Sequence, residues 1–193
     1  MFTKKFFKIF FLFLLLSVSG MYIYIYNLYK SKISETELNE MVLLINNSEE
    51  LPNKFVDYYL QIENYDIEKS TDNYLFTHFF DKILSLNLKK CPCYETNYGY
   101  SVWDTFERIS LGIQLDKRID KRKCIEYYLQ NKLIFPAHLK GVNLASLKYF
   151  KKEIKDLNSD QMLRLAVMSS NPYYYQKHHL QAKFIYWKNK IKK

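Results

Sequence analysis

The sequence contains little glycine, histidine and cysteine, and these shortages exclude several common classes of protein. Only 4 of the 193 residues are Gly. Neither a G-x-G-x-x-G string nor a P-loop string occurs, which argues against the commonest nucleotide-binding sites. Scarce glycine also argues against an all-β protein with many tight turns. With 4 His and 3 Cys, the composition argues against a zinc site built from several such ligands.

The abundant residue types indicate one folded, basic domain. Hydrophobic residues make up 48% of the chain and aromatic residues 18%, which excludes a disordered or collagen-like protein. The length fits a single domain with at most a short appendage. There are 29 Lys and Arg against 20 Asp and Glu, a net charge of +9, so anionic partners are expected.

The N-terminal residues form a long apolar run. Lys4, Lys5 and Lys8 precede residues 9–26, which carry no charge. At about 1.5 Å per residue, a helix over residues 6–28 spans a hydrocarbon core of roughly 30 Å. The sequence therefore predicts an uncleaved transmembrane anchor in residues 1–30. A signal peptide cleaved after the Ser-Val-Ser of residues 17–19 is the alternative, and either interpretation exports the rest of the chain.

The three cysteines leave two interpretations open. Export makes a disulfide chemically feasible, but Cys91, Cys93 and Cys124 are an odd number of thiols, so one stays free if a bridge forms. Cys124 pairs with one of the other two in the first interpretation. In the second, all three are ordinary thiols and Cys124 is buried.

After a juxtamembrane segment over residues 31–50, the apolar spacing is that of helices, so the predicted fold class is mainly α. Helices are expected after Pro52, over residues 74–88, after a cap at Asp120, through residues 144–150, and after a capping box at residues 158–161. Residues 89–100 are expected to form an irregular loop. Glu63 continues the apolar stripe of the helix after Pro52, and an acid there is either paired or kept for proton chemistry.

Four segments in the C-terminal half resemble the peptidoglycan glycosyltransferases of family 51, which have a lysozyme-like domain. Residues 120–130 (DKRKCIEYYLQ) are similar to the family segment S-K-x-x-I-L-E-x-Y-L-N, which opens a helix lining the active cleft. Residues 141–150 (GVNLASLKYF) resemble G-x-x-x-A-A/S-x-x-Y-F. Residues 157–166 (LNSDQMLRLA) resemble L-x-x-x-E-A-A-x-L-A, and residues 171–175 (NPYYY) resemble the P-x-x-Y turn.

The resemblance is weaker upstream. Residues 51–63 (LPNKFVDYYLQIE) resemble the stretch that leads into the family motif E-D-x-x-F-x-x-H-x-G, so that Glu63 matches its first catalytic glutamate. The rest of that motif departs from the pattern, with different residues at Asn64, Ile67, Ser70 and Asp72. The second motif, G-G/A-S-T-I-T-Q-Q, has residues 99–101 as its only counterpart. In the third motif, R-K-x-x-E, Glu107 is the best match to the second glutamate, without the preceding Arg and Lys.

The resemblance implies inverting glycosyl transfer from a lipid diphosphate. Glu63 would be the base that deprotonates the acceptor hydroxyl, and Glu107 would position the diphosphate or a divalent cation. No cofactor is implied as a requirement, and Mg²⁺ or Mn²⁺ is compatible with Glu107. On the segment at 120–130, the expected substrate-binding residues are Lys121, Arg122, Lys123, Glu126, Tyr128 and Gln130.

The resemblance also implies a place and partners. The transglycosylase-like domain is expected over residues 51–176, on the extracytoplasmic side of a single-pass protein of the cytoplasmic membrane. Its partners would be the lipid-linked disaccharide, the glycan strand, the membrane and other proteins of cell-wall synthesis. Residues 177–193 are expected to form a basic tail that is solvated or contacts lipid, and export argues against nucleic acid as its ligand.

Two alternatives to the glycosyltransferase remain. The departures in the first and second motifs suit a catalytically degenerate relative that acts as an envelope scaffold or interaction module. A secreted lysozyme-like hydrolase would instead use an acid with a second carboxylate or a positioned water.

Overall fold

The computed structural model describes residues 4–68, 71, 91, 93, 105–174 and 179–191. The expected helix over residues 74–88, the rest of the expected loop over 89–100 and the motif candidate at 99–101 lie outside the described residues. So do Ser70, Asp72 and residues 177–178 and 192–193 of the expected tail. The described part is mainly α, as predicted, with a single two-stranded ladder.

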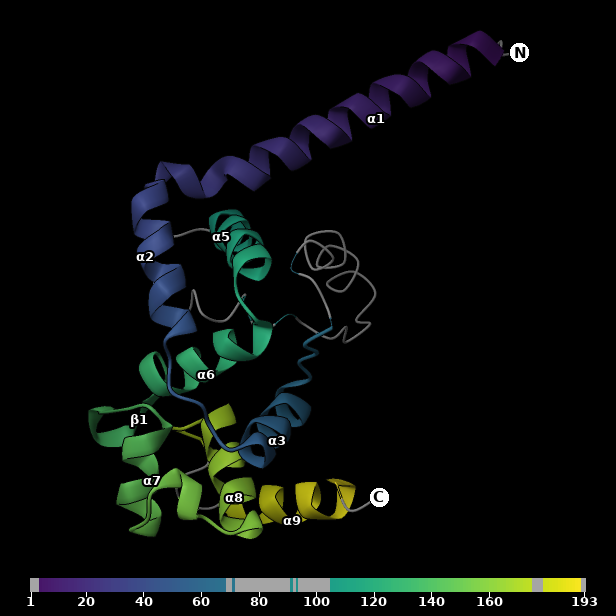
Figure 1. The fold of residues 1–193 in the computed structure, drawn as a ribbon. Helices are drawn as coiled ribbons and strands as arrows, with labels where there is room; N and C mark the ends of the chain where they lie inside the picture. The colour runs from purple at the N-terminus through teal and green to yellow at the C-terminus, as the bar shows by residue number, and fades with distance from the viewer. Residues whose placement is uncertain are drawn as a thin grey trace.

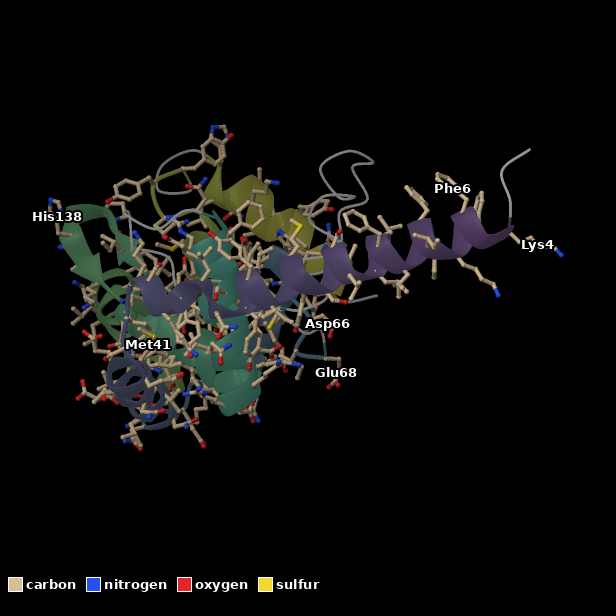
Figure 2. The ribbon with its side chains drawn as sticks, turned by 90° about the horizontal axis from the view of Figure 1, so that it is seen from above. Lys4, Phe6, Met41, Asp66, Glu68 and His138 are labelled. Atoms are coloured by element: carbon tan, nitrogen blue, oxygen red, sulfur yellow. A yellow bond between two sulfur atoms is a disulfide. The ribbon has the colours of Figure 1, made fainter. Side chains whose placement is uncertain are left out.

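The chain begins with a long helix that extends away from the rest of the molecule. Helix α1 (Lys4–Asn27) continues into the 3-10 turn η1 (Leu28–Ser31), and Figure 1 shows α1 projecting from the domain as a single rod. The apolar span Phe6–Ser31 is 26 residues long and is exposed over most of its length before Ile25, which fits the predicted transmembrane anchor. In Figure 2, Lys4 and Phe6 lie at the end of α1 that is farthest from the other helices.

An upper group of helices lies beneath α1 (Figure 1). It consists of α2 (Glu35–Asn46), which begins at a capping box formed by Ser34 and Glu37, and α5 (Thr105–Arg118). Its core contains apolar side chains from η1, α2 and α5 together with all three cysteines.

A lower group contains most of the remaining elements. Helix α3 (Asn53–Glu63) packs against α8 (Ser159–Ser170), and α7 (Val142–Phe150) packs against α8 through the larger apolar core. The strands β1 (Ile134–Phe135) and β2 (Leu139–Lys140) pair antiparallel, with Phe135 opposite Leu139, around the 3-10 turn η3 (Pro136–His138). A last 3-10 turn, η4 (Ile154–Asp156), leads into α8.

Helix α6 (Lys121–Asn131) joins the two groups because it contributes to both cores. Cys124 lies in the upper core, whereas Ile125, Tyr128 and Leu129 lie in the lower one. The N-cap that we predicted at Asp120 is confirmed, since its side chain accepts a hydrogen bond from the Arg122 amide at 2.8 Å. The helix is therefore started by its own sequence and fixed by packing on two sides.

The chain beyond α8 differs from the expected basic tail. Residues 180–191 form helix α9 (Leu180–Ile191), which packs against α8. Phe184 is buried between the helices with Leu163 and Val167, and the Arg164 guanidinium lies 3.9 Å from the centroid of its ring. The lysines of this segment indicated a charged tail, but its apolar residues recur at helical spacing, so that the segment forms a helix with one buried face.

Two further predictions from the sequence are settled in the described residues. The capping box at the start of α8 is confirmed, because the side chains of Asn158 and Gln161 each accept from the other residue's backbone amide. Of the two interpretations of the cysteines, the bridge is the one observed. It joins Cys93 to Cys124 and leaves Cys91 as a buried thiol.

Candidate functional site

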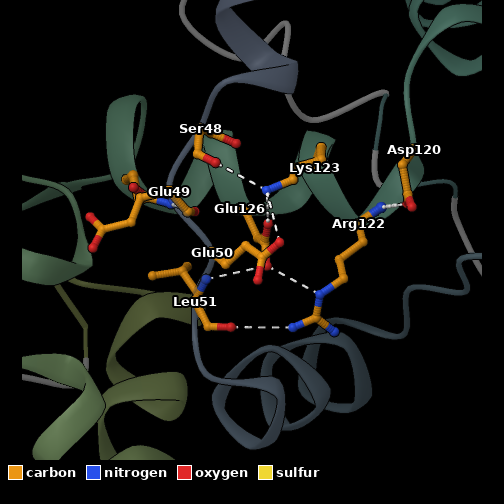
Figure 3. A network of polar contacts seen from close by, with 9 residues as sticks. Ser48, Glu49, Glu50, Leu51, Asp120, Arg122, Lys123 and Glu126 are labelled. Atoms are coloured by element: carbon orange, nitrogen blue, oxygen red, sulfur yellow. Dashed lines mark hydrogen bonds and ion pairs between the residues drawn. The ribbon is translucent and has the colours of Figure 1, made fainter.

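The predicted substrate-binding helix α6 faces the linker that connects α2 to α3. Glu126 is completely buried on this face. Its Oε1 accepts a hydrogen bond from the Arg122 Nε at 3.1 Å and from the Leu51 amide at 3.3 Å. Figure 3 shows these contacts between the helix and the linker. A buried carboxylate needs partners of this kind, since leaving it unpaired would cost several kcal/mol.

The basic side chains of α6 also bind backbone carbonyls of the same linker. The Arg122 Nη2 donates to the Leu51 carbonyl at 3.3 Å, and the Lys123 Nζ donates to the Ser48 carbonyl at 3.0 Å (Figure 3). Lys123 also lies 3.4 Å from the Glu126 Oε2. Farther along the helix, the Gln130 Nε2 donates to the Glu49 carbonyl at 2.7 Å. Four of the predicted site residues are thus brought together, and they clamp the linker.

A glycine fixes how closely the next segment approaches α6. Gly141 has a φ of +84°, and a Cβ added there would lie 2.1 Å from the backbone oxygen of Gln130. Any side chain would have to displace that carbonyl, so the position requires glycine. This requirement explains why one of the few glycines stands at the start of the segment 141–150.

The other predicted residues of α6 point elsewhere. The Lys121 Nζ lies 3.5 Å from the Asp116 Oδ1, on the side of the upper core. Tyr128 is buried in the lower core. The six residues that the sequence analysis assigned to one binding surface therefore divide between the linker, the upper core and the lower core.

The two predicted catalytic glutamates lie on helices of different groups. Glu63 is the last residue of α3, half-buried, and is followed by Asn64 in the left-handed conformation that ends the helix. Glu107 is buried in the first turn of α5, where its Oε1 lies 3.4 Å from the Lys32 Nζ. Between them, residues 69–70, 72–90, 92 and 94–104 lie outside the described part.

An open pocket of about 650 Å³ lies beside the linker and was not predicted from the sequence. Its lining includes Glu49, Glu50 and Glu153 and one lysine, Lys155, which pairs with Glu153 at 2.7 Å, next to apolar surface from Leu51 and Leu147. Apolar surface with a few polar groups is typical of a ligand site. The excess of carboxylates would repel a diphosphate, so the pocket suits a neutral or cationic ligand.

The junction between α1 and α5 is held by buried polar contacts. The Tyr29 amide donates to the Ser110 Oγ at 2.9 Å, and that hydroxyl donates to the Tyr26 carbonyl at 3.2 Å. The Gln114 Nε2 donates to the same carbonyl at 3.3 Å, and the Lys117 Nζ lies 4.5 Å from the centroid of the Tyr26 ring. The end of a helix leaves backbone carbonyls and amides without partners inside the helix, and side chains of α5 supply the missing hydrogen bonds here.

The three cysteines of the upper core are deeply buried. Cys91, Cys93 and Cys124 are each at most 1% exposed. Burial raises the pKa of the Cys91 thiol to about 11, so this sulfur is protonated at neutral pH. The odd number of cysteines had indicated a free thiol if a bridge formed, but spacing alone did not place it beside the bridge.

Comparison with known proteins identifies similarity over the second half of the chain. A family model described as Transglycosylase matches residues 88–191, more than half of the 193 residues. The matched residues include Glu107 and all of α6, and they begin after Glu63.

Three relatives carry the same name, biosynthetic peptidoglycan transglycosylase. The protein from Chromobacterium violaceum is 34% identical over 80 residues, which cover 42% of this chain and 35% of the relative. The protein from Methylobacillus flagellatus is 33% identical over 97 residues, covering 50% and 38%. The one from Acinetobacter baylyi is 34% identical over 70 residues, covering 36% and 31%. The chain thus aligns with about a third of the length of these relatives.

Proposed function

Because the chain belongs to the transglycosylase family, we propose that it is a peptidoglycan glycosyltransferase that joins lipid-linked disaccharides into glycan strands at a membrane. The names of the relatives support this class of reaction. The proposal extends to the substrates, the lipid-linked disaccharide and the growing strand, and to other proteins of cell-wall synthesis as partners.

One observation carries the membrane part of the proposal, namely the position at which α1 becomes buried. Large apolar side chains of α1 are exposed from Phe6 to Tyr24, and burial begins at Ile25. Residues 26–29 are then tied to α5 by the contacts of Ser110 and Gln114. With α1 in a bilayer, α5 would be held at the membrane boundary, where a lipid-linked substrate presents its diphosphate and sugar.

The proposed chemistry assigns the base to Glu63. The acceptor hydroxyl loses its proton to this carboxylate as its oxygen attacks the anomeric carbon of the donor. The bond from that carbon to the diphosphate oxygen breaks, the configuration inverts, and the lipid diphosphate leaves. Glu63 supports this assignment by being half-buried at the end of α3, a position that reduces solvation of a base while leaving it reachable.

The proposed role of Glu107 is to organise charge near the diphosphate. Its carboxylate pairs with Lys32, which lies just beyond the anchor, so the pair would lie near lipid headgroups. Among the described residues, the only cluster of three or more metal-ligating side chains is that of Cys91, Cys93 and Asp116. Glu107 does not belong to it, and we therefore derive no step through Mg²⁺ or Mn²⁺.

A second candidate function is favoured by the contacts of α6. Lys121, Arg122 and Lys123 were expected to bind the departing diphosphate, but each contacts an internal carboxylate, and two of them bind the linker. A diphosphate would have to compete with these contacts. This competition suits a catalytically degenerate member that keeps the fold as an envelope scaffold or interaction module.

The proposed location follows from the same reasoning. A single-pass anchor with the main domain outside the cytoplasm puts the domain on the side where glycan strands are assembled. A fusion of a periplasm-active reporter to the C-terminus tests this orientation, and activity of a cytoplasm-specific reporter at that position would contradict it.

Polymerisation of labelled lipid-linked disaccharide tests the function. The purified full-length protein is reconstituted into vesicles, with and without Mg²⁺ or Mn²⁺, and the products are separated by length. The enzyme predicts glycan polymers. Binding of the lipid-linked disaccharide with no polymer under any of these conditions would favour the scaffold and reject the glycosyltransferase.

A further inference from the structure

Three metal-binding side chains converge in the upper core, and a fourth is bonded to one of them, although the composition had argued against a zinc site. Cys91 and Cys93 precede α5, Asp116 lies in its last turn, and Cys124 lies in the first turn of α6. The ligand atoms of Cys91, Cys93 and Asp116 all lie within 4.8 Å of one another. Cys124 lies next to this group, since its sulfur is bonded to that of Cys93.

The distance between the ligand atoms of Cys91 and Asp116 fits a tetrahedral zinc ion. With Zn–S distances of about 2.3 Å and Zn–O distances of about 2.0–2.2 Å, neighbouring ligands of one ion lie roughly 3.5–3.8 Å apart. The Cys91 Sγ and the Asp116 Oδ1 are 3.7 Å apart. The two atoms can therefore bind one ion with little movement of the backbone.

The surroundings hold the aspartate in the orientation that a metal ligand needs. The Thr71 amide donates to the Asp116 Oδ2 at 2.9 Å, which leaves Oδ1 directed at Cys91. Lys121 lies 3.5 Å from Oδ1 and supplies positive charge beside a group of anionic ligands. Partners of this kind orient metal-binding side chains and tune the affinity of a site.

We propose that Cys91, Cys93, Cys124 and Asp116 bind one Zn²⁺ when the Cys93–Cys124 bridge is reduced. An external dithiol gives the bridge two electrons and two protons and becomes a disulfide itself. Zn²⁺ then displaces the protons of the three thiols. Oxidation of Cys93 and Cys124 removes two of the four ligands, so the bridge and the metal are alternative states of one site.

The ligand set favours Zn²⁺ over Mg²⁺ and Ca²⁺. Three sulfurs and one carboxylate suit a borderline-soft ion, whereas Mg²⁺ and Ca²⁺ require oxygen ligands. Either state joins the same parts of the chain, namely Cys91 and Cys93, α5 and α6. The site would thus hold this corner of the domain both before and after the chain meets an oxidant.

Metal binding by the full-length protein in detergent tests the proposal. The protein is reduced anaerobically with a phosphine, exposed to Zn²⁺ or Co²⁺, and freed of unbound metal. Reduced wild type should retain one zinc per chain, and cobalt should give the spectrum of a tetrahedral, thiolate-bound ion. The oxidised protein should bind neither.

Two variants remove single ligands. Cys91→Ser leaves the bridge intact in the oxidised protein, and Asp116→Asn keeps the shape of the side chain. Each should weaken zinc binding by the reduced protein on the order of 10–100-fold or more. Asp57→Asn, an exposed acid on α3, is the matched control and should bind as wild type does.

Three results would overturn the proposal. The first is a reduced wild type that keeps its helicity and binds no zinc. The second is equal binding by wild type and Cys91→Ser, which would mean unspecific capture by thiols. The third is a reduced protein that loses helicity and does not regain it with zinc, because the metal is proposed to hold the same segments as the bridge.

Discussion

Removing the Glu126 carboxylate should destabilise the protein more than removing any exposed acid. In Glu126→Ala the buried Leu51 amide loses its acceptor, at a cost of about 1–3 kcal/mol. The charged hydrogen bond from Arg122 is worth about 1.5–3 kcal/mol. Arg122 and Lys123 keep the carbonyls of Leu51 and Ser48, so we expect the lower end of the about 3–5 kcal/mol typical of a broken buried pair.

Thermal unfolding of the full-length protein in detergent, followed by circular dichroism, measures this effect. For a chain of this size, about 3 kcal/mol lowers the Tm by roughly 6–12 °C. Glu126→Gln keeps an acceptor for Leu51 and should cost only about 1–2 kcal/mol. Glu50→Gln is the control, because the Glu50 side chain is 86% exposed and should matter by less than about 0.5 kcal/mol. If Glu126→Ala and Glu50→Gln unfold at the same temperature, the linker clamp does not stabilise the fold.

Three other variants probe the junction of α1 with α5, the last helix and the stability of the fold at acid pH. Ser110→Ala deprives the buried Tyr29 amide of its acceptor and should lower the free energy of unfolding by about 1–3 kcal/mol. An unchanged Tm would show that the junction does not need this hydroxyl. Phe184→Ala should make α9 more accessible to proteolysis, because Phe184 is only 4% exposed. Tyr186→Ala is the control and should not, because Tyr186 is 53% exposed. Equal cleavage of the two variants would contradict the packing of α9. A hydrogen bond from the Tyr29 hydroxyl is the main cause that lowers the pKa of Glu35 from its usual 4.5. The ionised carboxylate therefore stabilises the fold above about pH 4.5, and this stabilisation is lost as the pH falls through the lowered pKa. Glu35→Gln should thus be less stable at neutral pH and lose less stability below about pH 4.5, and parallel pH profiles for wild type and variant would refute this.

Local signals in the sequence were sufficient to predict the starts of α6 and α8, whereas α2, α5 and α9 were not predicted. Asp120 and the pair of Asn158 and Gln161 act on amides two or three residues away, so their capping roles can be read directly. The apolar run of α1 is likewise a property of one continuous segment. The fold class followed from the same local spacing and from the resemblance of four short segments.

The partners of the charged residues on α6 were beyond the reach of local patterns. Arg122, Lys123 and Gln130 bind carbonyls in residues 48–51, more than seventy positions earlier in the chain. Nothing in the spacing of the basic residues distinguishes a carbonyl of the same chain from a phosphate of a substrate. The pocket beside the linker was missed for the same reason, since its lining combines residues 49–53 with residues 143–155.

The effect of Glu63→Gln on the rate of polymerisation tests the proposed function most directly. Loss of a general base slows a reaction by roughly 10²–10⁴-fold, while Glu68→Gln, an exposed acid five positions later, should leave the rate unchanged. The proposal predicts that wild type and Glu68→Gln polymerise lipid-linked disaccharide at the same rate and that Glu63→Gln produces almost none. Equal rates for all three proteins, or no polymer from folded wild type, would contradict it.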